Sequence, residues 1–201
     1  MSLENAEQWM KDGKLLIKNS SFGHASALLR FACEESAKAY VCWLTSEKML
    51  PLGNKVVEDF FWKHRVKNEV IVGMFLTVQW MNDNRILKNG VNEDFEPSEE
   101  EIIKTYRQFE AMLDSTEKMR QKAIYVNMNV ETEEIISPLK MDKQECKGLL
   151  EAVEFFFKMI RSCIEETSEK DKEKWRKFFS TIPREAWETG EIPIDWLKEK
   201  E

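Results

Sequence analysis

Residues 22–50 read FGHASALLRFACEESAKAYVCWLTSEKML, and this stretch decides the fold. At the helical spacing of about 100° per residue, its apolar residues fall on one face: Ala25, Leu28, Leu29, Ala32, Ala39, Tyr40 and Trp43. Asn19, Ser20 and Ser21 precede it, and these residue types are suited to cap the start of a helix. The sequence therefore predicts a long, apolar, central helix over residues 22–50.

Helical spacing also marks the segments on both sides of this helix. We expect helices over residues 4–18, 57–88, 98–122 and 142–167. Ser98 with Glu101, and Asp142 with Glu145, have the spacing of capping boxes for the last two. Residues 123–130 instead alternate apolar and polar types, which favours a short extended stretch. With only 7 Gly and 5 Pro in 201 residues, the predicted fold class is an all-α, up-and-down helical bundle.

The last part of the chain differs from the rest in composition. Residues 168–201 are highly charged yet contain three tryptophans, and Pro183 and Pro193 divide them into short pieces. A disordered tail rarely carries so many large aromatic residues. We therefore expect two parts, a helical bundle over residues 1–167 and a small helical C-terminal extension over residues 168–201.

Composition and charge argue against several classes of protein. The net charge of −7 and the pI of about 5.2 do not favour a general nucleic-acid-binding protein. The four scattered cysteines suggest neither a disulfide framework nor a zinc site, and two histidines are too few for a histidine-rich metal site. A signal peptide and a membrane-spanning run are also not evident. We expect a cytoplasmic protein with no metal, no cofactor and no membrane partner.

The central helix carries charged residues beside its apolar face. On a helical wheel Glu34, Lys38 and Arg30 share a polar edge, and Glu34 with Lys38 has the spacing of a surface ion pair. Glu35 lies at the border of the apolar stripe, where a carboxylate must be paired or protonated. Glu34 and Lys38 are therefore candidate binding residues, with a solvated edge as the alternative.

A partner for Glu35 is expected on the following helix. His64 falls near the centre of the apolar stripe of residues 57–88, and Lys67 follows three residues later. Glu35, His64 and Lys67 would form a polar cluster between two helices, with Glu35 and His64 as catalytic candidates and Lys67 as a binding candidate. A carboxylate and a histidine in contact can serve acid-base chemistry, but they can equally fix the register of two helices.

A second candidate cluster precedes the extended stretch. Lys118, Arg120 and Lys122 lie close to Tyr125, and three cations beside an aromatic ring can contact phosphates and a base. Glu110 and Glu117 are close to them in sequence, so an ordinary solvated helix face is the alternative. Arg120, Lys122 and Tyr125 remain candidate binding residues.

Four stretches, in order, resemble a known family. The run Ala32–Lys38, of the form Ala-x-Glu-Glu-x-x-Lys, is similar to the signature of the V-type abortive-infection proteins (AbiV), a branch of the HEPN superfamily. Phe60–Lys67, Arg120–Asn127 and Ser137-Pro138 resemble further segments of the same family. The resemblance covers residues 4–165. It implies a HEPN-type helical bundle, often dimeric, from a prokaryotic antiphage system, and it favours functional roles for Glu35, Lys38, His64 and Lys67.

The chain departs from one pattern of this superfamily. Many HEPN proteins are metal-independent ribonucleases with an Arg-x(4-6)-His motif. In this chain the positions where that arginine would precede His64 hold Val57, Glu58 and Asp59. The corresponding positions ahead of His24 are Ile17, Lys18 and Asn19, and Lys18 lacks the guanidinium geometry that holds phosphate. The resemblance therefore implies a homodimeric antiphage protein that binds a phage or translation-related protein, or RNA. A ribonuclease with an unusual site and a non-catalytic helical scaffold are the alternatives.

Overall fold

The structure is a computed structural model and describes residues 1–49, 59–83, 127–129 and 134–180, together with separate helical positions between residues 104 and 121. Its long helices in this part of the chain are α1 (Ser2–Lys18), α2 (Phe22–Ser46), α4 (His64–Asp83), α7 (Lys143–Glu166) and α8 (Glu169–Ser180). The predicted all-α fold class is confirmed. The predicted capping box at Ser98 and the tail residues beyond Ser180 lie outside the described residues.

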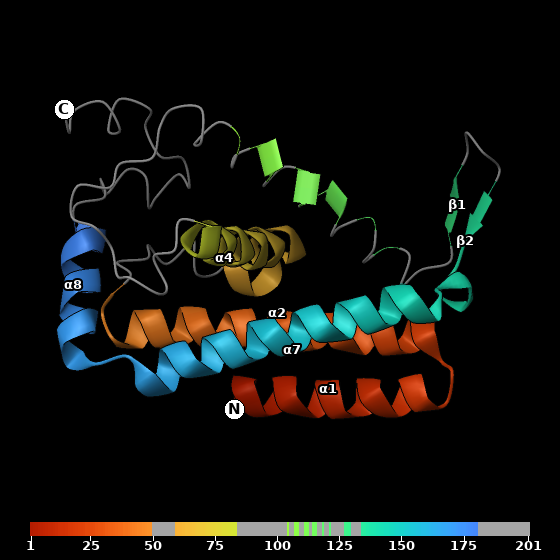
Figure 1. The fold of residues 1–201 in the computed structure, drawn as a ribbon, viewed down its shortest axis with the longest axis horizontal. Coiled ribbons are helices and arrows are strands. Elements are labelled where there is room, and N and C mark those ends of the chain that lie inside the picture. Colours follow the sequence, from red (N-terminus) through yellow and green to blue (C-terminus); the bar gives the residue numbers. More distant parts are fainter. Residues whose placement is uncertain are drawn as a thin grey trace.

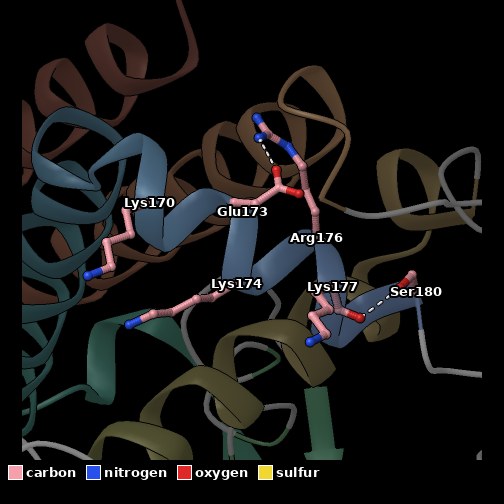
Figure 2. Close-up of a pocket in the computed structure, with 6 residues that line it drawn as sticks. All are labelled: Lys170, Glu173, Lys174, Arg176, Lys177 and Ser180. Carbon is pink, nitrogen blue, oxygen red and sulfur yellow. Dashed lines mark hydrogen bonds and ion pairs between the residues drawn. The ribbon is translucent and has the colours of Figure 1, made fainter.

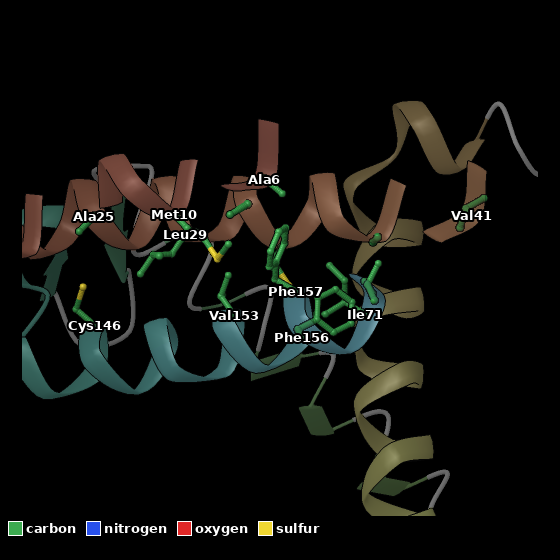
Figure 3. Close-up of a cluster of buried hydrophobic side chains, with 14 of the residues drawn as sticks. Ala6, Met10, Ala25, Leu29, Val41, Ile71, Cys146, Val153, Phe156 and Phe157 are labelled. Atoms are coloured by element: carbon green, nitrogen blue, oxygen red, sulfur yellow. The ribbon is translucent and has the colours of Figure 1, made fainter. Parts of the chain in front are cut away.

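Helix α2 is the centre of the bundle, as predicted. It packs against α1, α4 and α7. Figure 1 shows α1 running antiparallel to α2, whereas α7 runs in the same direction as α2 and lies beside it. Figures 1 and 3 show that α4 crosses this layer steeply instead of lying along α2.

The core lies where these helices meet, and α2 contributes mainly small residues to it (Figure 3). The buried residues that form one apolar cluster are Ala6, Met10, Ala25, Leu29, Ala32, Cys33, Ala37, Val41, Phe60, Ile71, Cys146, Val153, Phe156, Phe157 and Ile160. Small side chains on α2 let its neighbours approach closely, while Phe156 and Phe157 of α7 fill the remaining space. Close packing of this kind fixes the orientation of every face of α2.

Helices α1 and α2 both end in the same backbone motif. In α2 the Met49 amide donates to the Leu44 carbonyl oxygen (2.9 Å) and the Lys48 amide to that of Thr45 (3.1 Å), with Lys48 at φ 55°. This is a Schellman motif, which usually has glycine at the left-handed position. Because lysine occupies it here, the sequence pattern placed the end of the helix at residue 50 instead of Ser46. Ser20, at φ 59°, has the same position after α1.

The predicted helix over residues 57–88 is interrupted. Residues 59–62 form a short helical turn, and α4 begins at His64, so Lys63 separates two helical pieces. Phe60, in the first piece, is buried in the core, whereas Trp62 is exposed. This break sets the orientation of the first turn of α4, which carries the candidate residues His64 and Lys67.

A short hairpin and a tight turn precede α7. Strands β1 (Asn127–Asn129) and β2 (Glu134–Ile136) pair antiparallel, so the predicted extended stretch is confirmed for residues 127–129. The 3₁₀ turn η1 (Pro138–Lys140) follows and packs against α2. Asp142 then caps α7: its side chain accepts a hydrogen bond from the Glu145 amide at 2.8 Å, which completes the predicted capping box.

Helix α8 is held against the end of α2. Arg176 Nε donates to the backbone oxygen of Glu47 at 2.8 Å, and Lys172 Nζ lies 3.0 Å from a Glu47 carboxylate oxygen. Hydrogen bonds to Glu169 and Glu47 raise the pKa of Lys172, so its ammonium group is the favoured form. Cations at the end of α2 also suit its dipole, which is negative there. The first part of the predicted helical extension is therefore attached to the bundle.

Candidate functional site: a polar cluster between α2 and α4

Glu34, on α2, is the centre of a polar cluster that reaches from the core to the surface. The residue is buried, with 6% of its surface exposed. His64 Nδ1 lies 3.0 Å from both of its carboxylate oxygens, and Lys67 Nζ lies 3.5 Å from one of them. A carboxylate this deeply buried requires such partners.

The cluster differs from the sequence prediction in which glutamate it uses. Glu35 was expected to face His64 and Lys67, and Glu34 to lie on a polar edge with Lys38. Instead Glu34 turns inward, and Glu35 pairs with Lys38 on the same helix in a partly exposed position. Adjacent positions on a helix differ by about 100°, so an error of about that size in placing the buried face exchanges the roles of the two residues.

His64 and Lys67 lie one turn apart at the start of α4, so they share a helix face. Their environments differ, because the side chain of His64 is 48% exposed whereas that of Lys67 is 5% exposed. His64 was expected near the centre of the apolar stripe. The helix break at Lys63 instead makes His64 the first residue of α4 and places it at the edge, where its ring contacts both Glu34 and solvent.

The contact with Glu34 determines what His64 can do. When Nδ1 carries a hydrogen it donates to the Glu34 carboxylate, and Nε2, on the opposite side of the ring, then has its lone pair available. A histidine held in this way can accept a hydrogen bond from a bound partner or act as a base. The geometry permits both binding and proton transfer.

Two residues near the cluster were missed or misplaced by the sequence prediction. Trp62 is 80% exposed and lies two residues before His64, next to the exposed Lys63. Its signal was its place in an aromatic run, Phe60-Phe61-Trp62, of which only the first residue is buried in the core. Arg30, assigned to a polar edge, is buried instead, and its apolar neighbours Leu29 and Phe31 were the available signal.

The second candidate cluster falls mostly outside the described residues. Lys118 is an exposed helical position, whereas Arg120, Lys122 and Tyr125 lie outside the described residues. Within the described ranges, His, Cys, Asp and Glu side chains do not gather in groups of three or more that would suit a metal ion. No helix in that part of the chain has the length and apolar character needed to cross a membrane.

Burial should separate Cys42 from Cys33 and Cys146 in a thiol-labelling experiment. Burial raises the pKa of the Cys33 thiol to about 12 and also raises that of Cys42, although Cys42 is exposed. Because the thiolate is the reactive form, we expect iodoacetamide to label Cys42 first, at a rate that rises with pH beyond 9, and to leave Cys33 and Cys146 unlabelled in the native protein. Mass spectrometry of the digested protein measures this order. Equal labelling of Cys33 and Cys42 without denaturant would contradict it.

Comparison with known proteins adds one finding. The protein-family model HEPN_AbiV, described as AbiV, matches residues 1–154, which include α1, α2, α4 and the whole polar cluster. Comparisons with curated proteins and with solved structures gave no match. Helix α8 lies beyond the matched region.

Proposed function

This chain belongs to the AbiV family of HEPN proteins, and on this basis we propose that it is a cytoplasmic antiphage protein that acts by binding a phage or translation-related protein. The partner would dock on the surface around His64, which is the exposed part of the Glu34 cluster. In the other form of this proposal, the same surface binds RNA without cleaving it.

One observation supports binding over catalysis: each lysine of the cluster is already paired within the protein. Lys67 is buried and directed at Glu34, and Lys38 is paired with Glu35. A ribonuclease has to stabilise the negative charge of the phosphate that it cleaves, and Lys and Arg side chains commonly do this. With a spacer of four residues, the arginine of the Arg-x(4-6)-His motif would fall at Asp59, whose carboxylate instead pairs with Lys63. The cluster is therefore better suited to hold His64 in a fixed orientation than to stabilise a reacting phosphate.

A ribonuclease is the second candidate, and the Glu34–His64 contact favours it. A carboxylate that orients a histidine ring is a common arrangement in general acid-base catalysis. In this case His64 would transfer a proton to or from the reacting RNA, and Glu34 would orient its ring. Lys38 would have to leave Glu35 to contact the RNA. The two candidates make opposite predictions about cellular RNA.

The test is a phage challenge of cells that express the wild type, His64→Ala or His24→Ala, with RNA integrity measured in parallel. His24 is the matched control, because it is exposed at the start of α2 and its Nδ1 contacts Ser21 Oγ at 2.9 Å, away from the cluster. We expect His64→Ala to reduce protection by about tenfold or more, which is the loss of affinity expected when one residue that anchors an interface is truncated. His24→Ala should protect like the wild type, and cellular RNA should stay intact. RNA cleavage by the purified wild type in a chelator, lost in His64→Ala, would favour the ribonuclease.

The scaffold alternative has its own test. If the cluster only joins α2 to α4, then replacing Glu34 and Lys67 together with apolar residues should preserve both fold and protection. Loss of protection in a stably folded double variant would exclude it.

We also propose that the active form is a homodimer, which light scattering of the purified protein would check. A monomer at all concentrations that still protects would contradict this.

A further inference from the structure

A hollow of about 700 Å³ lies on α8, outside the part of the chain that matches the AbiV family. The described residues that line it are Lys170, Glu173, Lys174, Arg176, Lys177 and Ser180. Its volume falls within the range of small-molecule sites, about 300–1,000 Å³. Four of the six side chains are cationic and one is anionic, in a chain whose net charge is −7.

The lysines form a continuous stripe. Lys170, Lys174 and Lys177 are spaced by four and three residues, so all three lie on one helix face, and all are exposed. Figure 2 shows Lys170 and Lys174 extending to the same side of α8. Like charges at these spacings repel each other and weaken a helix. An anion bound between them would remove that repulsion.

The acidic residues of α8 do not neutralise this stripe completely. Glu169 pairs with Lys172 at 2.8 Å, on the side of α8 that faces Glu47. Glu173 pairs with Arg176 at 3.1 Å, and Figure 2 shows these two side chains turned toward each other. Asp171 accepts a hydrogen bond from Ser168 at 2.6 Å and lies 3.6 Å from Lys174. These contacts leave the described lining of the hollow with an excess of positive charge.

The hollow also lies on a fixed helix. Arg176, in its lining, donates from Nε to the Glu47 backbone oxygen, and Lys172 pairs with the Glu47 carboxylate. The lysine stripe is therefore attached to the end of α2, and part of the entropy cost of ordering a binding surface is already met by folding. None of the described lining residues is aromatic, so these residues provide charge without a ring on which a base could stack.

We propose that the α8 hollow binds a small anion with several linked phosphate groups, either an inorganic polyphosphate or the phosphate chain of a nucleotide. Lys170 and Lys177 are separated by about 10 Å along the helix axis. A chain of phosphates contacts the whole stripe without forcing the ammonium groups together, whereas a single orthophosphate contacts one or two of them. This site is independent of the proposed partner surface at His64.

The test is calorimetric titration of the full chain with sodium tripolyphosphate at constant ionic strength. We expect one saturable site, at least tenfold weaker binding of orthophosphate, and at least a tenfold loss of affinity in the triple variant Lys170→Gln, Lys174→Gln, Lys177→Gln. The matched control is Lys140→Gln, Lys143→Gln, Lys147→Gln, because these lysines are also exposed and similarly spaced and the charge change is the same. The control should bind like the wild type.

Two further measurements identify which kind of phosphate chain binds and check that the variants are folded. ATP that binds more tightly than tripolyphosphate would assign a nucleotide, and equal or weaker binding would assign an inorganic chain. Circular dichroism should show the same helix content in all variants, because the substituted lysines are exposed. Absence of saturable binding to the wild type, or equal losses in the two triple variants, would overturn the proposal.

Discussion

Replacing Glu34 with leucine is expected to lower the free energy of unfolding by about 3–5 kcal/mol. The substitution removes the carboxylate to which the buried Lys67 ammonium group is directed at 3.5 Å. Lys67 then keeps a buried charge without that partner, and the loss of one member of such a pair is far more costly than the loss of a surface pair. Urea denaturation followed by circular dichroism measures the change.

Two companion variants separate this explanation from a general effect of substitution in α2. Glu35→Leu removes the neighbouring glutamate, whose pair with Lys38 is partly exposed, and should cost less than about 1 kcal/mol. The double variant Glu34→Leu, Lys67→Met removes both buried charges and should recover most of the lost stability. A Glu34→Leu protein as stable as Glu35→Leu would show that the buried pair does not hold α4 against α2.

Replacing Gly23 with alanine is expected to destabilise the protein by about 3 kcal/mol or more, at the upper end for an overpacked site. A Cβ atom there would lie 1.9 Å from the Pro138 carbonyl oxygen and 2.4 Å from its carbonyl carbon. These are backbone atoms, so no side-chain rotation relieves the clash, and η1 must move away from the start of α2. The urea midpoint should fall accordingly.

Two other glycines are matched controls for this substitution. Gly148, inside α7, has nothing within 4 Å of an added Cβ, so Gly148→Ala should stabilise the protein by up to about 1 kcal/mol through helix propensity. At Gly13 the nearest atom would be a methyl carbon of the Leu29 side chain at 3.1 Å, which can shift, so Gly13→Ala should be close to neutral. Equal effects at Gly23 and Gly148 would mean that η1 does not constrain α2.

The sequence was sufficient to predict α1, α2 and α7 because their signals are local. Apolar spacing identified α2 as the central helix, and the Asp142 and Glu145 pair located the start of α7. The end of α2 was placed four residues too far along the chain because Lys48 adopts the left-handed conformation that usually indicates glycine. Local rules describe common residues at such positions, and this helix end uses an uncommon one.

The site was predicted in part. The residue types and the two helices were right, but the buried glutamate was placed at Glu35 instead of Glu34. Which of two adjacent residues points inward depends on the crossing of α4 over α2, and no local pattern contains that information. The hollow on α8 was not predicted at all, because its lysines are ordinary in sequence and become a site only when the helix is fixed against Glu47.

The position of α2 between α1 and α7 has a consequence for how the chain folds. Helix α1 precedes α2 directly, so the two can pair as soon as both have been synthesised, with little loss of loop entropy. Helix α7 reaches α2 only after residues 47–142 have been closed into a long loop, and contacts between such distant residues form slowly. Until Phe156 has left the ribosome, the part of α2 that packs against α7 is therefore uncovered, and the nascent pair of α1 and α2 depends on later residues to complete its core.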